Sequence, residues 1–349
     1  MANWSCDVKR ILVVGGGLIG VRHVQAVQAH SRCSLVGLVD PDMTIQTDVP
    51  RFASMADVAE LVDGVIIATP THLHASHGAE AAERGWHMLI EKPVAASLES
   101  ARQLETVLRG GNARSLVGHH RRYHAVVQQL KSCLAEEEIG NVVNVSVLWA
   151  MRKPDAYFDC NWRSAAGSPV MINLVHDIDI LRFVIGEIVQ TTALRGQSLR
   201  GGSRVESGAI ALVFENGAVG SITFSDVTPS PWGFEAGTGE NPNIGTTYQD
   251  MMWIAGTKGA ISFPSMTLWK GTDWGRAAEA VALSPAQNLK TPLEAQLDHF
   301  LDVIDGCKPL IDVADATVTL GIAEALEAQL AIQTSGAGPI ISTKGQNFN

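Results

Sequence analysis

The sequence predicts an α/β protein in which a doubly wound parallel sheet is followed by a second domain built on an antiparallel or mixed sheet. In the first third, short continuous apolar runs alternate with helical stretches, which is typical of a parallel sheet covered on both faces. After about Tyr123, apolar and polar residues alternate instead, as in residues 142–149. A length of 349 residues favours two domains, and we expect residues 1–122 to form the first and residues 123–349 the second.

The individual elements follow from these patterns. In the first domain, strands are expected at residues 10–14, 34–39, 65–68, 87–90 and 115–118, and a helix at 18–29. In the second, strands are expected at 142–149, 208–214, 218–225 and 251–263, the last broken at 256–259, and helices at 173–185, 292–304 and 315–333. Asn216-Gly217 between two strands is a strong hairpin signal. The Pro- and Gly-rich segment Thr228–Thr246 shows neither the hydrophobic period of a helix nor that of a strand, and it is expected to be a long loop.

The composition excludes several classes of protein. Hydrophobic residues make up 46% of the chain and charged residues 18%, which fits a compact enzyme rather than a disordered protein. The net charge of −10 disfavours nucleic acid or an anionic membrane as a partner, because both need a concentrated basic face. The five cysteines are scattered without a Cys-x-x-Cys pair, so we expect free thiols in a reducing compartment. With no apolar signal region and no membrane-length apolar run, a cytoplasmic protein is expected.

A glycine-rich turn follows the first predicted strand. Gly15, Gly17 and Gly20 form the pattern Gly-x-Gly-x-x-Gly, with Leu18 and Ile19 before the last glycine. Between a strand and a helix, this pattern predicts a dinucleotide site, in which the glycines allow a tight turn, close approach of the pyrophosphate and close helix–sheet packing. The helix N-terminus offers its free N–H groups to the phosphates. The alternative is a flexible glycine turn, which this context disfavours.

Asp40 ends the second predicted strand, about twenty residues after the glycines, the spacing expected of the acid that binds the ribose hydroxyls. Its carboxylate would repel a 2′-phosphate, so we expect NAD rather than NADP as the cofactor. The alternative is a surface aspartate in the turn before Pro41.

Two further turns follow the third and fourth predicted strands, at the carboxyl edge where open α/β sheets bind ligands. We expect the cofactor to be bordered by Thr69-Pro70, by His74 a few residues further on, and by Glu91-Lys92. Lys92 is the candidate for catalysis, because a partly desolvated lysine beside nicotinamide can polarise or protonate a substrate oxygen. The alternative is an ordinary surface lysine. No metal site is expected, since the histidines near the first turn lack a carboxylate cluster: His72, His74 and His77.

Taken together, these motifs resemble the glucose–fructose oxidoreductase/inositol dehydrogenase (Gfo/Idh/MocA) family. The glycine turn, Ala68-Thr69-Pro70 with His74, and Glu91-Lys92-Pro93 match in order. Residues 118–123, Gly-His-His-Arg-Arg-Tyr, are similar to the family's Gly-x-x-Arg-Arg-aromatic exit from the cofactor domain. Trp162-Arg163, followed by Gly167 and by His176-Asp177-Ile178-Asp179, is similar to its substrate helix. The matches run from residue 11 to about residue 185.

The resemblance implies an N-terminal Rossmann domain and a C-terminal α+β domain with a large open, mainly antiparallel sheet that often makes dimer or tetramer contacts. It implies Lys92 and His176 as the catalytic pair and a cis peptide bond between Lys92 and Pro93. His176 also suits the chemistry by itself, because a neutral imidazole can take the alcohol proton as the hydride leaves. Without the family context, a buried and merely hydrogen-bonded histidine would be the favoured interpretation.

One position departs from the family pattern. Many members carry an acid four residues before this histidine, where this sequence has Ile172. The adjacent Asn173 cannot act as a base but can hydrogen-bond a hydroxyl group. Asp179, on the same helical face as His176, can orient the imidazole. We therefore expect a variant substrate pocket.

An aromatic face with fixed hydrogen-bond donors suits the ring of a sugar. The candidates for such a pocket are His120, Arg121, Tyr157, Trp162, Arg163, Asn173 and Asp179. Trp232 and Glu240, in the segment Thr228–Thr246, are candidates for a lid. The alternative for all of these side chains is packing in the core or at its rim.

The leading hypothesis is reversible, NAD-dependent oxidation of a secondary alcohol in a sugar, cyclic polyol or related small hydroxy compound. The enzyme would be inositol dehydrogenase-like and a homodimer or homotetramer through its C-terminal sheet. Two alternatives stay open, a glycosidase of the same family that uses bound NAD transiently and a non-enzymatic regulator that responds to NAD or a sugar. Lys92 and His176 count against the regulator.

Overall fold

The structure is a computed structural model that describes residues 8–332 apart from 43, 45–47, 159–167, 202–203, 272–273, 275–277 and 288. It divides into two compact units. Unit 1 comprises Met1–Gln129, Val175–Phe183 and Ala286–Ile322, and unit 2 comprises Leu130–Leu174, Val184–Pro285 and Ala323–Asn349. The domain boundary between residues 122 and 123 stays a prediction, and Trp162 and Arg163 lie outside the described residues.

Unit 1 is built on a six-stranded sheet in the order β3-β2-β1-β4-β5-β6, and all neighbouring strands are parallel. The strands are β1 (Lys9–Val14), β2 (Cys33–Val39), β3 (Arg51–Phe52), β4 (Gly64–Ile67), β5 (His87–Ile90) and β6 (Ser115–Val117). The chain runs outward from β1 on both sides, so the strand order reverses between β1 and β4, where doubly wound sheets bind their ligands. The predicted doubly wound parallel sheet is confirmed.

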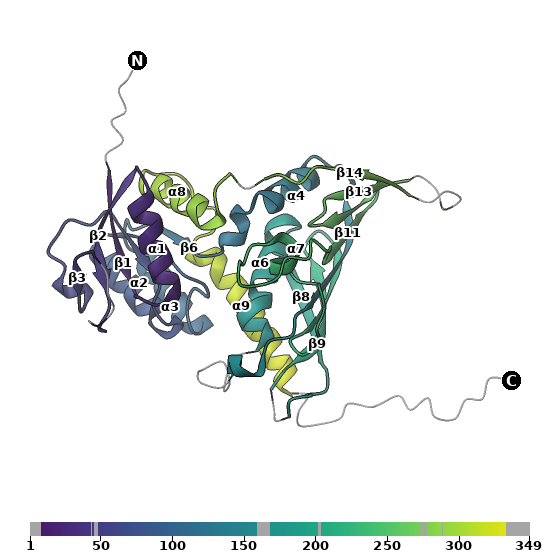
Figure 1. Ribbon diagram of the computed structural model, residues 1–349, viewed down its shortest axis with the longest axis horizontal. Coiled ribbons are helices and arrows are strands. Elements are labelled where there is room, and N and C mark those ends of the chain that lie inside the picture. The colour runs from purple at the N-terminus through teal and green to yellow at the C-terminus, as the bar shows by residue number, and fades with distance from the viewer. Residues whose placement is uncertain are drawn as a thin grey trace, which may run out of the picture. The chain divides into compact units, whose positions relative to one another are not determined.

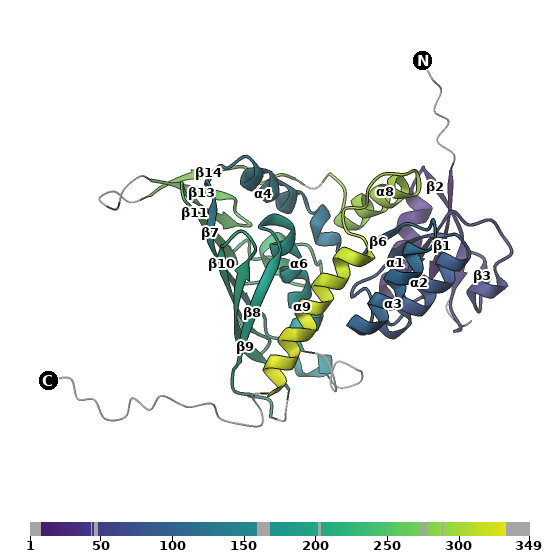
Figure 2. The same cartoon turned by 180° about the vertical axis from the view of Figure 1, so that it is seen from behind.

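Helices cover both faces of this sheet. On one face, α1 (Leu18–Ala29) contacts α8 (Pro292–Ile304), and on the other α2 (His74–Glu83) contacts α3 (Leu98–Arg109). Figure 1 shows α1 in front of the sheet, whereas α2 and α3 are in front in Figure 2. Both faces are therefore buried, which explains why the strands are continuously apolar. Among the described residues of this unit, short 3₁₀ turns lie at Met55–Asp57, Thr71–Leu73 and His120–Tyr123.

Unit 2 is built on an eight-stranded sheet in the order β14-β13-β12-β11-β7-β10-β9-β8. The strands are β7 (Val142–Ala150), β8 (Ile188–Arg195), β9 (Ser207–Phe214), β10 (Val219–Ser225), β11 (Met252–Gly256), β12 (Ala260–Phe263), β13 (Thr267–Lys270) and β14 (Glu279–Ala282). β7 and β10 pair in parallel, and the other neighbours pair antiparallel. The hairpin between β9 and β10 turns at Asn216-Gly217, where Gly217 has φ +86°. The expected open, mainly antiparallel sheet is confirmed.

The helix that carries His176 begins irregularly. Val170–Leu174 form a π-helix, which α6 (Val175–Val184) continues as an α-helix. Two other helices are α4 (Ala125–Ala135) and α9 (Val313–Ile332), and Asp155–Phe158 form a 3₁₀ turn. Within unit 2, Gln329 of α9 accepts a hydrogen bond from the backbone N–H of Ala193 in β8 at 2.7 Å.

The segment Thr228–Thr246 corrects one expectation, because it contains the short helix α7 (Phe234–Thr238). Phe234 is fully buried and its ring stacks on that of Phe263, with centroids 6.0 Å apart. A helix of this length is too short to show a period in the sequence. Several strands were also missed, and these are short or lie towards the edges of their sheets: β3, β8, β13 and β14.

Candidate active site

The glycine turn after β1 has the geometry that its pattern predicts. Gly15 has φ +101°, and a Cβ atom there would lie 2.6 Å from the carbonyl oxygen of Ala68. A Cβ on Gly20 would lie 1.9 Å from the carbonyl oxygen of Gly15. Around Gly17, by contrast, a Cβ would meet nothing within 4 Å. Gly15 and Gly20 therefore serve the packing of the turn, while Gly17 borders open space.

The N-terminus of α1 faces the same turn without a capping side chain. Gly17 is its N-cap and makes no side-chain hydrogen bond, and no acidic residue lies in the first turn. Leu18, the first helical residue, is 80% exposed. The first N–H groups of α1, including those of Leu18 and Ile19, are the donors that a helix N-terminus offers to a phosphate. These features fit a dinucleotide pyrophosphate.

Asp40 lies beside this turn, directly after β2. Its Oδ2 accepts a hydrogen bond from the backbone N–H of Gly16 at 2.6 Å, and its Oδ1 accepts one from the N–H of Asp42 at 2.8 Å. The carboxylate is therefore fixed next to the glycine turn, at the carboxyl edge of the sheet, where a ribose that follows the pyrophosphate would lie.

His74 links the turns that follow β4 and β5. The imidazole is 1% exposed, its Nε2 lies 2.8 Å from the carbonyl oxygen of Thr69, and its Nδ1 lies 2.8 Å from that of Pro93. Burial lowers the pKa of His74, so the two carbonyl groups compete for the single N–H of a neutral ring. Pro70 precedes the short 3₁₀ turn at Thr71–Leu73. The Lys92–Pro93 peptide bond is cis, as expected.

Glu91 places a buried negative charge beside Lys92. Its side chain is 9% exposed, and its Oε1 lies 2.9 Å from Nε2 of His23 on α1. Its Oε2 accepts a hydrogen bond from the backbone N–H of Lys92 at 3.2 Å. Burial would raise the pKa of Glu91, but the hydrogen bond and charge of His23, together with the charges of His120 and Lys92, lower it to about 2. Glu91 is therefore ionised at neutral pH.

His176 lies among basic side chains of unit 1. The residue is 5% exposed, and its ring centroid is 5.5 Å from that of His120 and 6.1 Å from that of His119. Burial holds the pKa of His176 well below its usual 6.5, and the positive charges of Lys92 and Arg121 act in the same direction. The ring is thus neutral at neutral pH. Its buried Nδ1 has no hydrogen-bond partner among the described residues.

Asp179, expected beside the substrate, is 1% exposed and bound to Arg122. Its carboxylate accepts hydrogen bonds from Arg122 Nε at 2.9 Å and Nη2 at 2.7 Å, and Oδ2 lies 3.5 Å from Nδ1 of His119. Burial would raise the pKa of Asp179, but His119 and Arg122 outweigh this and lower it. Burial also lowers the pKa of His119 to about 4. Asp179 is therefore bound to Arg122 and lies beside His119, and its suggested roles towards His176 and the substrate stay predictions.

Four other substrate candidates are described in the structure. His120 and Arg121 belong to unit 1, and Tyr157 and Asn173 belong to unit 2. Asn173 accepts a hydrogen bond from Nζ of Lys153 at 2.6 Å, and the same ammonium lies 5.1 Å from the ring centroid of Tyr157. The lid candidate Trp232 is 37% exposed and forms an isolated β-bridge with Ala150. Its backbone is thus attached to β7.

Two family models match the chain. The model of the oxidoreductase family with the NAD-binding Rossmann fold, GFO_IDH_MocA, matches residues 9–119. The model of the GFO/IDH/MocA C-terminal domain matches residues 127–262. The chain belongs to the Gfo/Idh/MocA oxidoreductase family. Its N-terminal domain is therefore an NAD-binding Rossmann domain, and the family and cofactor expected from the sequence are confirmed.

Several members of the Gfo/Idh/MocA family are similar to this chain. The rhizopine catabolism protein MocA of Rhizobium meliloti is 26% identical over 330 residues, which cover 90% of this chain and 93% of that protein. The glucose-6-phosphate 3-dehydrogenase of Bacillus subtilis is 30% identical over 179 residues, and this match spans only 51% of its length. The crystal structure of the WlbA dehydrogenase from Bordetella pertussis in complex with NADH and UDP-GlcNAcA has a TM-score of 0.73 at 23% identity, covering 93% of this chain and 97% of that one.

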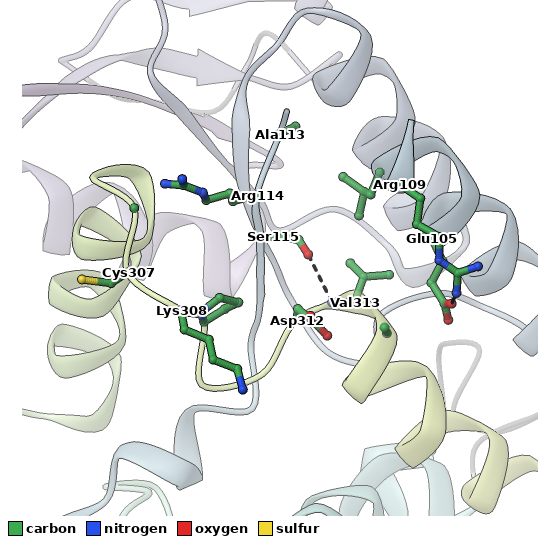
Figure 3. A pocket seen from close by; sticks show the side chains of 13 residues that line it. Glu105, Arg109, Ala113, Arg114, Ser115, Cys307, Lys308, Asp312 and Val313 are labelled. Carbon is green, nitrogen blue, oxygen red and sulfur yellow. Dashed lines mark hydrogen bonds and ion pairs between the residues drawn. The ribbon is translucent and has the colours of Figure 1, made fainter. Parts of the chain in front are cut away.

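Apart from the residues of the candidate active site, unit 1 has a pocket of about 410 Å³ at the start of β6 (Figure 3). Three of its charged side chains are already engaged, since Arg109 pairs with Glu105 at 2.8 Å and Asp312 accepts a hydrogen bond from the N–H of Asp315 in α9. The pocket is at the amino end of its strand, whereas the glycine turn and Lys92 follow carboxyl ends. We therefore assign neither cofactor nor substrate to it. No helix in the described part of the chain is long and apolar enough to cross a membrane.

Sequence reasoning missed three residues that the structure places beside the candidates. His23 is on α1, where its buried contact with Glu91 could have been inferred only from the tertiary structure. His119 was part of a quoted motif but was given no role. Lys153 lies 20 residues before Asn173, in a segment of the sequence without any motif.

Proposed function

We propose that this chain catalyses the reversible, NAD-dependent oxidation of a secondary alcohol in a sugar, cyclic polyol or related small hydroxy compound. The observation that carries the proposal is the neutral His176, whose Nδ1 has no partner among the described residues, under the influence of the positive charge of Lys92. An unpartnered neutral imidazole can accept a hydroxyl proton, and a nearby ammonium can stabilise the oxygen that loses it. Both residues belong to the unit that carries the glycine turn.

In this proposal, NAD⁺ held by the glycine turn would supply the acceptor for the hydride that leaves the alcohol carbon. His176 accepts the proton of the hydroxyl group, and Lys92 donates a hydrogen bond to the same oxygen, which becomes the carbonyl oxygen. In the reverse direction, the protonated imidazole returns the proton to that oxygen. Glu91, ionised and bonded to the backbone of Lys92, holds the segment in place.

The cofactor would be held by the residues that form the turns at the carboxyl edge of the sheet. The N–H groups at Leu18, Ile19 and Gly20 would bind the pyrophosphate over the open space at Gly17. Asp40 would accept hydrogen bonds from the ribose hydroxyls. The segments that His74 links would border the nicotinamide half of the cofactor: Thr69, Pro70, Glu91 and Lys92.

We further propose inositol dehydrogenase-like specificity, with substrate contacts from Arg121, Tyr157, Trp162, Arg163, Asn173 and Asp179. The buried position of Asp179 favours an indirect contribution, through Arg122 and His119. The described cysteines Cys33, Cys133 and Cys307 are free thiols, which supports a cytoplasmic location.

For the oligomer, we propose a homodimer or homotetramer that forms through the eight-stranded sheet. One row of exposed residues crosses its central strands in register: Trp253, Ser146, Ser221 and Ala211. Small side chains in such a row allow another sheet to approach closely. Sedimentation velocity tests this proposal, and a monomer at micromolar concentration would contradict it.

The test of the catalytic proposal uses Lys92→Ala and His176→Ala. Both variants should lose at least about a thousandfold in kcat on any alcohol that the wild type oxidises, while NADH affinity, measured by fluorescence titration, stays within about threefold. Lys258→Ala, on the exposed surface of unit 2, is the control. Full activity of both variants would overturn the assignment. Release of an aglycone from a glycoside without accumulation of NADH would instead identify an NAD-assisted glycosidase.

A further inference from the structure

His23 is a buried polar side chain of α1 to which the proposed reaction gives no role. The residue is 1% exposed and lies three residues after Gly20, in the helix that begins at the glycine turn. Its Nε2 lies 2.9 Å from Oε1 of Glu91, which directly follows β5. A polar group buried this deeply needs a hydrogen-bond partner, and the carboxylate of Glu91 is such a partner for the imidazole.

The hydrogen bond between His23 and Glu91 has a defined direction. Burial would raise the pKa of Glu91, but the hydrogen bond from His23 and the charge of Lys92 contribute to lowering it to about 2. An ionised carboxylate can only accept hydrogen bonds. Nε2 of His23 therefore carries the hydrogen and donates it to Oε1. Charge-assisted hydrogen bonds are stronger than neutral ones, so His23 restrains the orientation of the carboxylate.

Gly118 leaves the room that this orientation requires. It directly follows β6, and its N–H donates to the carbonyl oxygen of Ile90 in the neighbouring strand β5 at 2.7 Å. A Cβ atom on Gly118 would lie 2.9 Å from Oε2 of Glu91 and 3.0 Å from its Cα. A side chain at position 118 would thus displace the carboxylate, whereas glycine admits it.

The second oxygen of the same carboxylate reaches Lys92. Oε2 of Glu91 accepts a hydrogen bond from the backbone N–H of Lys92 at 3.2 Å. His23 is therefore connected, through Glu91, with the backbone of the proposed catalytic lysine. His23, Glu91, Lys92 and His176 all belong to unit 1, so the connection lies within one compact part of the molecule.

We propose that His23 is a positioning residue for the reaction: by donating to Glu91 it fixes the backbone of Lys92, which directs the ammonium group to the substrate oxygen. The inference rests on the proposed function, because it depends on the role given to Lys92 there. The same contact ties the Lys92 segment to α1, the helix whose N-terminus would bind the pyrophosphate. Positioning of this kind is effective, since a displacement of about 1 Å can cost about a hundredfold in rate.

Two substitutions of His23 form a matched pair that differs mainly in the hydrogen-bond donor. His23→Gln keeps an N–H donor, whereas His23→Met has a side chain of similar length without one. Loss of a hydrogen bond to a charged group corresponds to about a ten- to hundredfold effect. We therefore expect His23→Met to lose that factor in kcat on any alcohol that the wild type oxidises, and His23→Gln to stay within about threefold. NADH affinity, measured by fluorescence titration, should stay within about threefold in both.

Hydrogen exchange of the Lys92 amide tests the contact without turnover. Measured by mass spectrometry with fragmentation, it should be at least about tenfold faster in His23→Met than in the wild type, because the acceptor on Glu91 is no longer held. Gly118→Ala displaces the same carboxylate without changing His23, so it should have the same effect, and it provides the test if His23→Met does not fold.

His30→Met is the control. His30 is the C-cap of α1, about 10 Å further along the helix, and its Nε2 lies 2.8 Å from Oδ1 of Asp298. This substitution removes a second contact between a histidine of the same helix and a carboxylate, and it should change neither the exchange of the Lys92 amide nor kcat.

The inference is overturned if the Lys92 amide exchanges at the wild-type rate in His23→Met and Gly118→Ala, or if His23→Met keeps full activity. It is also overturned if His23→Gln is as impaired as His23→Met, because the donor would then not matter. If the wild type oxidises no alcohol, the proposed function fails, and the exchange rates alone decide whether His23 fixes the backbone of Lys92.

Discussion

Gly17 and Gly20 lie three residues apart in the same turn, yet their surroundings predict opposite effects of a single added methyl group. Gly20→Ala would place Cβ 1.9 Å from the carbonyl oxygen of Gly15, whereas real Cβ atoms essentially never come within 3.0 Å of such an atom. The turn must therefore shift by about an ångström. Overpacking of this kind destabilises a protein by about 1–3 kcal/mol, which corresponds to roughly 2–10 °C in thermal midpoint for a domain of this size.

Gly17→Ala should leave stability almost unchanged. Its Cβ would meet nothing within 4 Å, and its backbone, at φ −69° and ψ −175°, is accessible to alanine. The loss of glycine at an N-cap costs about 0.5 kcal/mol. The methyl group would instead occupy the space through which the pyrophosphate approaches the N–H groups of α1. Losing one charge-assisted hydrogen bond lowers NADH affinity about ten- to a hundredfold.

Differential scanning calorimetry and an NADH fluorescence titration separate the two effects. Gly20→Ala should show a lowered midpoint without ligand, and Gly17→Ala a normal midpoint with weakened binding. Gly85→Ala is unsuitable as a control because Gly85 has φ +73°, but Gly245→Ala meets no atom within 4 Å and carries no φ strain. Wild-type NADH affinity in Gly17→Ala would refute the view that the open space at this glycine receives the pyrophosphate.

Two further predictions concern the buried and half-buried carboxylates of unit 1. Asp40→Ala should raise the affinity for NADPH relative to NADH at least about tenfold, because the charge that repels a 2′-phosphate is gone; an unchanged ratio in competitive titrations would remove Asp40 from the ribose site. Glu91→Gln should lower the free energy of unfolding by about 3 kcal/mol at pH 7, because the pKa of Glu91 is about 2 in the folded protein against an ordinary 4.5. Since a depressed pKa stabilises the fold above pH 4.5 and this contribution fades as the pH falls towards 2, the difference should be smaller at pH 3.5 than at pH 7 in urea titrations. A difference that does not change with pH would contradict the assigned ionisation.

The strands and helices of the first domain were predictable because each is indicated by a few consecutive residues. The strands β1 and β5 and the helix α1 follow from continuous apolar runs and from a glycine pattern between a strand and a helix, each contained in a few consecutive residues. The resemblance to the family brought Lys92 and His176 into one hypothesis. The edge strand β8 and the five-residue helix α7 escaped, because an exposed strand shows little hydrophobic alternation and one helical turn shows no period.

The partners of buried charges were not predictable, because they depend on contacts distant in sequence. Arg122 and Asp179 are 57 residues apart, and His23 and Glu91 are 68 residues apart. The sequence placed Asp179 on the same helical face as His176 and so suggested that it orients that imidazole. The carboxylate binds Arg122 and lies beside His119, two contacts that a shared helical face does not predict, while its role towards His176 stays a prediction.

The charges around His176 give a physical reason for the departure from the family pattern at Ile172. In unit 1, burial lowers the pKa of His176, and the positive charges of Lys92 and Arg121 act in the same direction. Position 172 is four residues before His176 in the sequence. A carboxylate close to an imidazole raises its pKa, because it favours the protonated ring. Isoleucine brings no charge that would oppose the lowering of the pKa of His176. The departure from the family pattern is therefore consistent with a histidine that stays neutral and can accept the proton of an alcohol.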